Sequence, residues 1–185
     1  MAIPWKPTKE QLLAAVNKTV PDVIAPRLQV LFSGINPGLY TAAVGHHFAR
    51  PGNRFWPALH AGGFTQQIVS PFDERLLLKN GYGITNVVQR ATATADQLSK
   101  EELREGCTQL TAKVLRFKPA YLAILGLGAY RVAWNKPKAV IGRQDERIGS
   151  TIIWVLPNPS GLNAHYQAAD LGRLFAELKD AVHSP

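Results

Sequence analysis

The sequence predicts a single α/β domain with a mostly parallel central sheet of about four to five strands and helices on both faces. Three observations favour this fold. The chain has 185 residues, the size of one compact domain. Helical and strand patterns alternate along it, and Tyr121–Leu125 is an unbroken apolar run, typical of a strand buried on both faces. We expect residues 1–185 to form this domain, with residues 1–26 as an N-terminal helix and arm packed on it.

The first half of the chain predicts three helices, two strands and one long loop. In order these are a helix over Thr8–Thr19, a strand over Leu28–Ser33, a loop over Gly34–Arg50, a helix from Asn53 to His60, a short helix over Glu74–Lys79 and a strand over Gly83–Val88. The prolines between residues 21 and 26 end the first helix. Asn53 and Asp73 are residue types that cap helix N-termini, so they mark where the next two helices begin.

The second half predicts three helices and two strands. In order these are a helix from Ser99 to about Leu115, a strand over Tyr121–Leu125, a short helix over Gly128–Trp134, a strand over Thr151–Leu156 and a helix over Gln167–Val182. Ser99 and Glu102 have the spacing of a capping box, and Pro157 ends the last strand. Asp145 and Glu146 lie in a turn-like stretch before that strand.

Composition and charge exclude several classes of protein. Hydrophobic residues make up 46% and charged residues 18%, which excludes a disordered or fibrous chain. Cys107 is the single cysteine, so an intramolecular disulfide and a cysteine-held iron–sulfur cluster are excluded. No signal peptide and no membrane-spanning stretch is expected, so the predicted location is the cytoplasm, with the nucleoid in a bacterial cell. The net charge of +8 favours nucleic acid as the partner.

Two loops that follow strands carry unusual residues. The first, Gly34–Phe48, begins with an Asn-Pro-Gly turn that holds Asn36 in place, and the second, Pro157–His165, places Asn158 in a similarly stiff turn. Because the carboxyl ends of parallel strands meet at one edge of the sheet, both loops are expected beside one ligand crevice. Leu162 stands on a polar tip and either packs into the core or inserts into a base stack.

These motifs carry a resemblance to a known family. GINPGL followed by an aromatic residue, PGNRFW and NPSGL, together with GITNVVQRAT and AILGLGAY, resemble the mismatch-specific uracil/thymine branch of the uracil-DNA glycosylase superfamily. The likeness runs from about Leu31 to Val182. The uracil-specific branch has Asp and His at the positions of Asn36 and Asn158, so the chain resembles the mismatch branch.

The resemblance implies an activity and a set of base-binding residues. The expected reaction is hydrolysis of the N-glycosidic bond of uracil, and of some other damaged or mispaired pyrimidines, in double-stranded DNA and above all in G·U mismatches. It follows flipping of the base out of the helix and leaves an abasic site. Asn36 would position the attacking water. Residues Ile35, Gly38, Thr41, Phe48 and Asn158 would bind the base. Phe48 would stack on it, and Gly38 would leave room for a C5 methyl group.

The resemblance also implies how the duplex is held. Gly161, Leu162 and Asn163 would fill the gap left by the flipped base. Family members often have an Arg two residues after this leucine, but this chain has Ala164 there, and the neighbouring His165 is the candidate replacement. Predicted phosphate contacts are Arg50, Arg54, Arg90 and His165. We expect a monomer without a metal or other cofactor.

A carboxylate could assist Asn36, and the positions of the acidic residues single out one candidate. Only Asp96 lies in a loop that follows a predicted strand. It is either an auxiliary catalytic carboxylate or a solvated loop acid or helix cap. Neither loop motif contains a lysine, so no Schiff base and no lyase cleavage are expected.

Three alternative interpretations bear on the function. The pair His46–His47 has no acid or cysteine nearby in the sequence, so contact with phosphate or with the pocket mouth is favoured over a metal site. Gly126 and Gly128 begin a dinucleotide-binding pattern, but its third glycine position is Arg131. A non-catalytic DNA module that senses mismatches on the same fold stays open as the alternative function.

Overall fold

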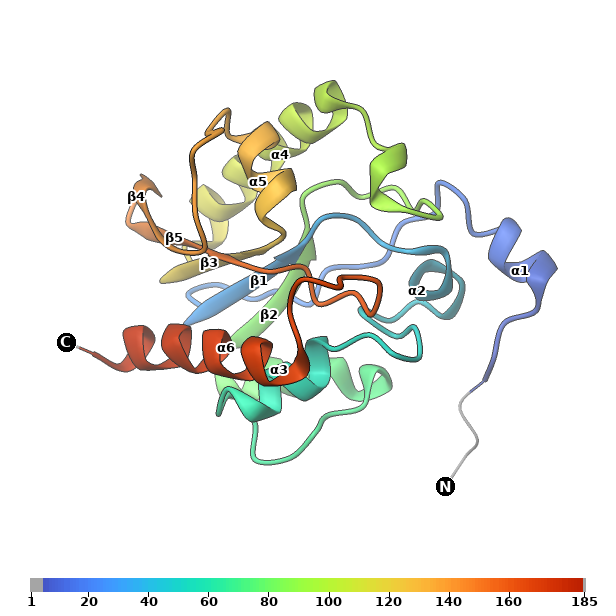
Figure 1. Ribbon diagram of the computed structural model, residues 1–185, viewed down its shortest axis with the longest axis horizontal. Coiled ribbons are helices and arrows are strands. Elements are labelled where there is room, and N and C mark those ends of the chain that lie inside the picture. Colours follow the sequence, from blue (N-terminus) through green and yellow to red (C-terminus); the bar gives the residue numbers. More distant parts are fainter. Residues whose placement is uncertain (1–4, 185) are drawn as a thin grey trace.

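The computed structural model describes residues 5–184, which form one α/β domain around a single sheet (Figure 1). The strands are β1 (Val30–Gly34), β2 (Tyr82–Asn86), β3 (Tyr121–Leu125), β4 (Gly142–Ile148) and β5 (Thr151–Leu156). Their order is β2-β1-β3-β5-β4, with β4 alone antiparallel to its neighbour. The predicted mostly parallel sheet is therefore confirmed.

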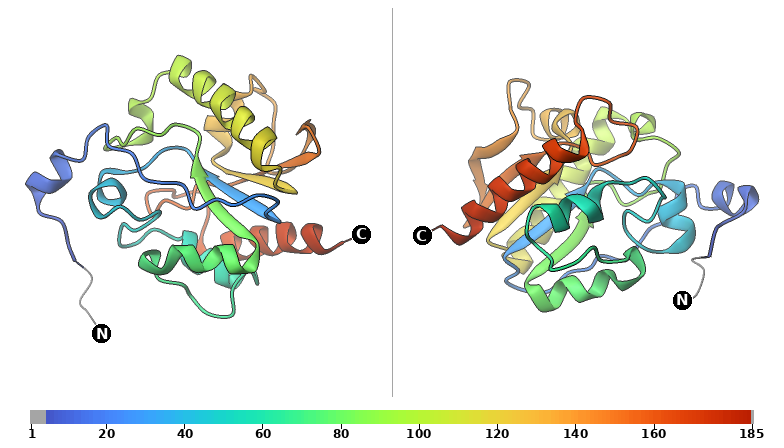
Figure 2. Two further views of the ribbon diagram at one scale, coloured as in Figure 1. Left: turned by 180° about the vertical axis from the view of Figure 1, so that it is seen from behind. Right: turned by 60° about the horizontal axis from the view of Figure 1, so that its bottom comes forward.

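Helices cover both faces of this sheet, as predicted (Figures 1 and 2). The α-helices are α1 (Lys9–Leu13), α2 (Leu39–Val44), α3 (Phe55–Ala61), α4 (Lys100–Phe117), α5 (Leu127–Ala133) and α6 (Ala168–His183). Two 3₁₀ helices, η1 (Pro71–Asn80) and η2 (Ala95–Gln97), complete the elements of the described residues. One core joins α3, α6 and η1 to the sheet around Phe32 and Phe175, and the other joins α4 and α5 to it around Leu110 and Tyr130.

Sequence patterns located the central elements well. The strands β3 and β5 have the predicted bounds, and α4 begins with the predicted capping box, in which Ser99 and Glu102 each accept a hydrogen bond from the other's backbone N–H. The predicted helix from Asn53 is α3, and the Asn53 side chain accepts a hydrogen bond from the Phe55 amide at 2.9 Å.

Three elements were not predicted from the sequence: the helix α2, the strand β4 and the three-residue 3₁₀ helix η2, which lies in the loop expected around Asp96. Helix α2 lies inside the stretch that was predicted to be a loop, and it is only six residues long, with a glycine at each end. Strand β4 contains the stretch interpreted as a turn; it is an edge strand whose alternating charged residues face solvent. Charges on an edge strand discourage pairing with other chains, and they also remove the apolar signal of a strand.

Two helices differ from their predicted form. The first helix is shorter than predicted, because the chain turns at Asn17 soon after α1 ends. Asn17 has a left-handed φ of 64°, and its amide donates a hydrogen bond to the Ala91 carbonyl oxygen. The predicted short helix over Glu74–Lys79 is part of the 3₁₀ element η1, which Ser70 caps instead of Asp73.

Candidate active site

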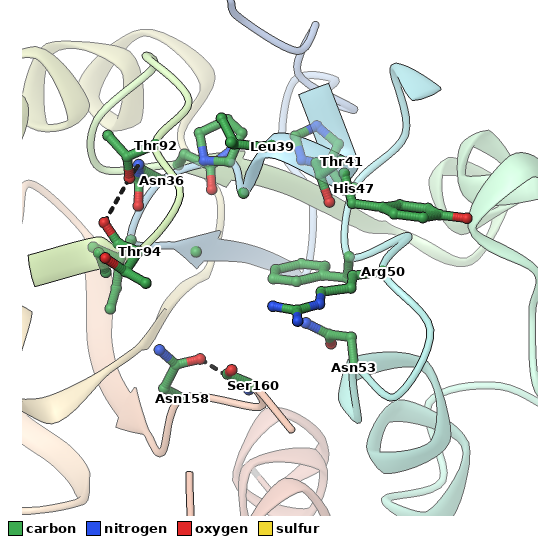
Figure 3. A pocket seen from close by; sticks show the side chains of 18 of the residues that line it. Asn36, Leu39, Thr41, His47, Arg50, Asn53, Thr92, Thr94, Asn158 and Ser160 are labelled. Atoms are coloured by element: carbon green, nitrogen blue, oxygen red, sulfur yellow. Dashed lines mark hydrogen bonds between the residues drawn. The ribbon is translucent and has the colours of Figure 1, made fainter. Parts of the chain in front are cut away.

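The two loops meet, as predicted, at the carboxyl edge of the sheet and enclose a cavity of about 380 Å³ (Figure 3). Asn36 lies at one side of this cavity, Arg50 and Asn53 lie across it, and Asn158 approaches from the second loop. Eight of the predicted site residues line it: Ile35, Asn36, Gly38, Thr41, Phe48, Arg50, Asn158 and Leu162.

The amide of Asn36 is held in one orientation. Its Nδ2 donates hydrogen bonds to the Arg90 carbonyl oxygen at 3.0 Å and to Thr92 Oγ1 at 2.7 Å. The Thr92 hydroxyl donates its own hydrogen to the Thr94 carbonyl oxygen, so it can only accept from Asn36. Both contacts therefore require the NH₂ group, and Oδ1 is left to accept a hydrogen bond from water or substrate. No donor from the described residues bonds to it.

Phe48 presents an aromatic surface to the cavity. One face of its ring stacks on Phe55 at a centroid distance of 4.2 Å, and its backbone is left-handed with φ of 53°. Gly34 makes this position possible, because a Cβ there would lie 3.3 Å from the Phe48 ring and 2.6 Å from Asn86 Oδ1. The ring is thus fixed at the end of β1, where a planar group in the cavity can stack on it.

Asn86 is a cavity residue that sequence reasoning missed. It ends β2 beside Gly34, lines the cavity and is only 3% exposed. Its Nδ2 has no hydrogen-bond partner among the described residues. A buried polar group without a partner is costly, so this donor is available to a substrate acceptor. The sequence pattern predicts a strand over Gly83–Val88 and so places Asn86 inside it, whereas β2 ends at Asn86 and leaves this residue at the sheet edge.

The second loop is a rigid turn with an exposed apolar tip. Asn158 Oδ1 accepts from the Ser160 amide at 3.0 Å, and Asn163 Nδ2 donates to the Asn158 carbonyl oxygen at 3.0 Å. Gly161 packs on the segment that follows the first loop, because a Cβ there would lie 2.7 Å from the Gly52 carbonyl oxygen. Leu162 is 73% exposed, so of the two interpretations of this leucine, packing into the core is wrong.

Arg54 braces the second loop, so the predicted phosphate contact is wrong. Its guanidinium donates to the carbonyl oxygens of Ser160 at 2.7 Å, Asn163 at 2.8 Å and Tyr166 at 2.5 Å. Three of its five N–H groups are therefore engaged by the protein and Nε is buried, so four of the five are unavailable to a phosphate. The sequence motif around Arg54 thus joins the two loops.

This brace gives a prediction for stability. Arg54→Lys is expected to lower the free energy of unfolding by about 1–3 kcal/mol. The lysine ammonium lacks the planar guanidinium geometry that lets Arg54 donate hydrogen bonds to three carbonyl oxygens at once. Urea denaturation measures the change. Arg50→Lys is the matched control, since Arg50 is exposed and its loss should leave the unfolding midpoint unchanged. Equal midpoints for the two variants would contradict the bracing role.

Arg90 and Asp96 are not placed as predicted. The Arg90 guanidinium pairs with Glu102 at 2.5 Å, and the hydrogen bond from Arg90 lowers the pKa of Glu102 to about 2. Arg90 is therefore an internal ion-pair partner, and its contribution to the cavity is the carbonyl that holds Asn36. Asp96 is exposed on η2, accepts a hydrogen bond from the Thr94 hydroxyl and does not line the cavity. Among the residues that the structure describes, no carboxylate lines it.

Of the remaining predicted residues, His47 lines the cavity, in agreement with the expected place at the pocket mouth, and the others lie outside it. Asn163 and His165 line a neighbouring hollow that Ile35 and the start of α5 also border, and Gly161 packs on Gly52. His46 and His47 are held by Glu74, which is 5% exposed: His46 Nδ1 lies 3.0 Å from its Oε1, and the His47 amide donates to its Oε2 at 2.7 Å. Glu74 therefore fixes the segment that leads into Phe48.

Within residues 5–184, no cluster of three or more His, Cys, Asp or Glu side chains could hold a metal ion. No helix in that range has the length and hydropathy needed to cross a membrane.

Comparison with known proteins places the chain in a family. A solved structure from Methanosarcina acetivorans, described as a "putative Uracil DNA glycosylase", has 20% sequence identity and a TM-score of 0.59. The similarity covers 89% of this chain and 99% of that one, and it supports the fold. The family model of the uracil DNA glycosylase superfamily matches residues 21–181. Because this match spans most of the 185 residues, the chain belongs to the uracil DNA glycosylase superfamily.

Proposed function

We propose that the protein is a monofunctional, mismatch-specific DNA glycosylase that hydrolyses the N-glycosidic bond of uracil, above all in G·U pairs of double-stranded DNA. One observation carries the proposal: the fixed amide of Asn36 and the exposed tip of Leu162 border the same cavity, although the two loops lie far apart in the sequence. A pocket of about 380 Å³ between a polar anchor and an apolar wedge suits a single nucleotide flipped out of a duplex.

The cavity supplies each group that the reaction needs. Phe48 offers a stacking face and Asn86 a free amide donor for a carbonyl of the base. Such a donor also stabilises the negative charge on the leaving base. Asn36 Oδ1 accepts a hydrogen bond from the attacking water, whose oxygen bonds to C1′ as the bond from C1′ to N1 breaks. The electron pair leaves with the base, and the water proton passes to solvent.

The absence of a carboxylate from the described cavity lining suits an amide that orients water without removing its proton. The barrier then depends on how well the departing base bears its negative charge and how well the sugar cation is stabilised. A base that is a poorer leaving group should therefore be released more slowly. Asp96 lies on the surface outside the cavity and has no auxiliary role in the proposed reaction.

Gly38 gives a prediction for substrate choice. It caps α2 in an extended conformation, and a Cβ at Gly38 would meet no atom within 4 Å. Gly38→Tyr should therefore fold normally and place a ring beside the base. The ratio of single-turnover rates for G·U and G·T duplexes is expected to rise about tenfold, since rejection of one methyl group is worth ~1–3 kcal/mol. An unchanged ratio would mean that Gly38 does not border the C5 position.

Double-stranded DNA is the proposed partner, held by the net charge of +8 and by Arg50, the exposed arginine at the cavity. Arg54 and Arg90 are engaged within the protein, so the phosphate contacts are fewer than the sequence suggested. Binding should weaken as salt rises, and Arg50→Gln should make that dependence shallower.

The proposed activity is tested with a labelled duplex that contains one G·U pair. The protein is expected to release free uracil and to leave an abasic site that alkali cleaves, while untreated strands stay intact. Borohydride should trap no covalent adduct, because no lysine lies in either loop. Tight binding of the G·U duplex without uracil release would instead assign the non-catalytic mismatch-sensing function.

A further inference from the structure

The residues before the family match contribute directly to the candidate active site. The match begins at residue 21, yet Leu12 of α1 lines the cavity together with residues of both loops. Helix α1 packs against α2, and the segment is anchored by Ala15, which is fully buried in a small cluster with Ala42 and Ala91. Figure 1 shows α1 beside α2, at the side of the molecule where the first loop lies.

The same N-terminal segment is hydrogen-bonded to residues 90–92, which orient Asn36. The Asn17 amide donates to the Ala91 carbonyl oxygen at 2.9 Å, and the Ala91 amide donates to the Lys18 carbonyl oxygen at 2.8 Å. Asn17 Oδ1 also accepts from Arg90 Nη1 at 3.1 Å. The residues on either side of Ala91 are the two acceptors of the Asn36 amide, Arg90 and Thr92. Residues 90–92 are therefore held by the N-terminal segment on one side and by Asn36 on the other.

We infer that residues 8–18 are a functional part of the site: Leu12 is a wall of the nucleotide pocket, and Asn17 is a positioning residue that acts on Asn36 through residues 90–92. This inference rests on the proposed glycosylase function. Leu12 is half-buried at the cavity, whereas its neighbour Leu13 is 61% exposed and does not line it. The left-handed backbone of Asn17 suits asparagine, aspartate and glycine, so its side chain can be changed without forcing the chain to refold.

Five variants separate these roles from general packing. Leu12→Ala removes the wall, Leu12→Met restores its bulk, and Leu13→Ala is the matched control on the same helix. Asn17→Gly removes the acceptor for Arg90 but keeps the left-handed turn, and Asn17→Asp, added as its conservative partner, keeps the acceptor. Each protein is assayed for uracil release from the G·U duplex, and for the fluorescence of 2-aminopurine placed next to the uracil in the bound duplex, which reports flipping.

The two residues should affect different readouts. Leu12→Ala is expected to lower the 2-aminopurine signal and to slow uracil release about fivefold to twentyfold, with Leu12→Met and Leu13→Ala within about twofold of the wild type. Asn17→Gly is expected to lower kcat about threefold to tenfold at unchanged KM, and Asn17→Asp to restore it. If the two residues were only structural, both variants would lower the Tm. Leu12→Ala would then not affect flipping selectively, and Asn17→Gly would not affect kcat selectively.

The outcomes distinguish the inference from the function on which it rests. If the wild type releases uracil and Leu12→Ala and Asn17→Gly match Leu13→Ala in both readouts, the inference alone is wrong. If the wild type flips the base without releasing it, the proposed hydrolysis is wrong, and the fluorescence of Leu12→Ala still decides whether Leu12 forms the wall. If the wild type does neither, both proposals fail.

Discussion

Replacing Asn36 by alanine is expected to lower the single-turnover rate of uracil release about 10²–10³-fold, the usual loss when one oriented polar group is removed from a transition state. The expectation follows from the fixed amide: its Nδ2 is bound to Arg90 and Thr92, so Oδ1 has one defined direction. Binding of the G·U duplex should change little, because the residues that stack on the base and enter the duplex are untouched. Rapid-quench assays with excess protein measure the rate.

Asn36→Asp tests whether orientation or proton acceptance dominates. Aspartate would place an oxygen against the Arg90 carbonyl oxygen, where the amide now donates a hydrogen bond. The carboxylate should therefore lose its fixed position, and the rate should fall below that of the wild type even though a carboxylate is the better base. Asn80→Ala, at an exposed residue on η1, is the control for an asparagine outside the site. A rate above the wild type for Asn36→Asp would contradict the orienting role.

The fold could be predicted because its centre has strong local signals. Strands β3 and β5 are apolar runs whose ends coincide with glycine or proline, and α4 has a complete capping box. Parallel strands then bring the loops that follow them to one edge, which is why Asn36 and Asn158 were expected, and found, at the same cavity.

Other features could not be predicted because they depend on contacts between distant residues. Arg54 and Arg90 look like free cations in the sequence, but their partners lie in the second loop and at the start of α4. Asn86 becomes a cavity residue only because β2 ends where Gly34 leaves space beside it. The polar edge strand β4 and the short helix α2 lack an apolar periodicity that would mark them.

Replacing Leu162 by alanine is expected to slow uracil release about tenfold to a hundredfold for a U·A pair and markedly less for a G·U pair. The side chain is 73% exposed and stands on a loop that Arg54 and Asn158 hold rigid, so it is preorganised to enter a duplex without supporting the fold. Extrusion of a paired base costs a few kcal/mol more than extrusion of a mispaired one, so loss of the wedge matters most where the pair is strongest.

The comparison that decides this role uses three substrates and one control variant. Rates are measured for U·A and G·U duplexes and for single-stranded DNA, in which no gap needs filling and the rate should not change. Val140→Ala, at a residue that is 66% exposed and does not line the cavity, should match the wild type on all three. The Tm of Leu162→Ala should also match it, since an exposed side chain stabilises the fold little. An equal loss of rate on all three substrates would instead mean that Leu162 acts on the chemistry and not on the opening of the duplex.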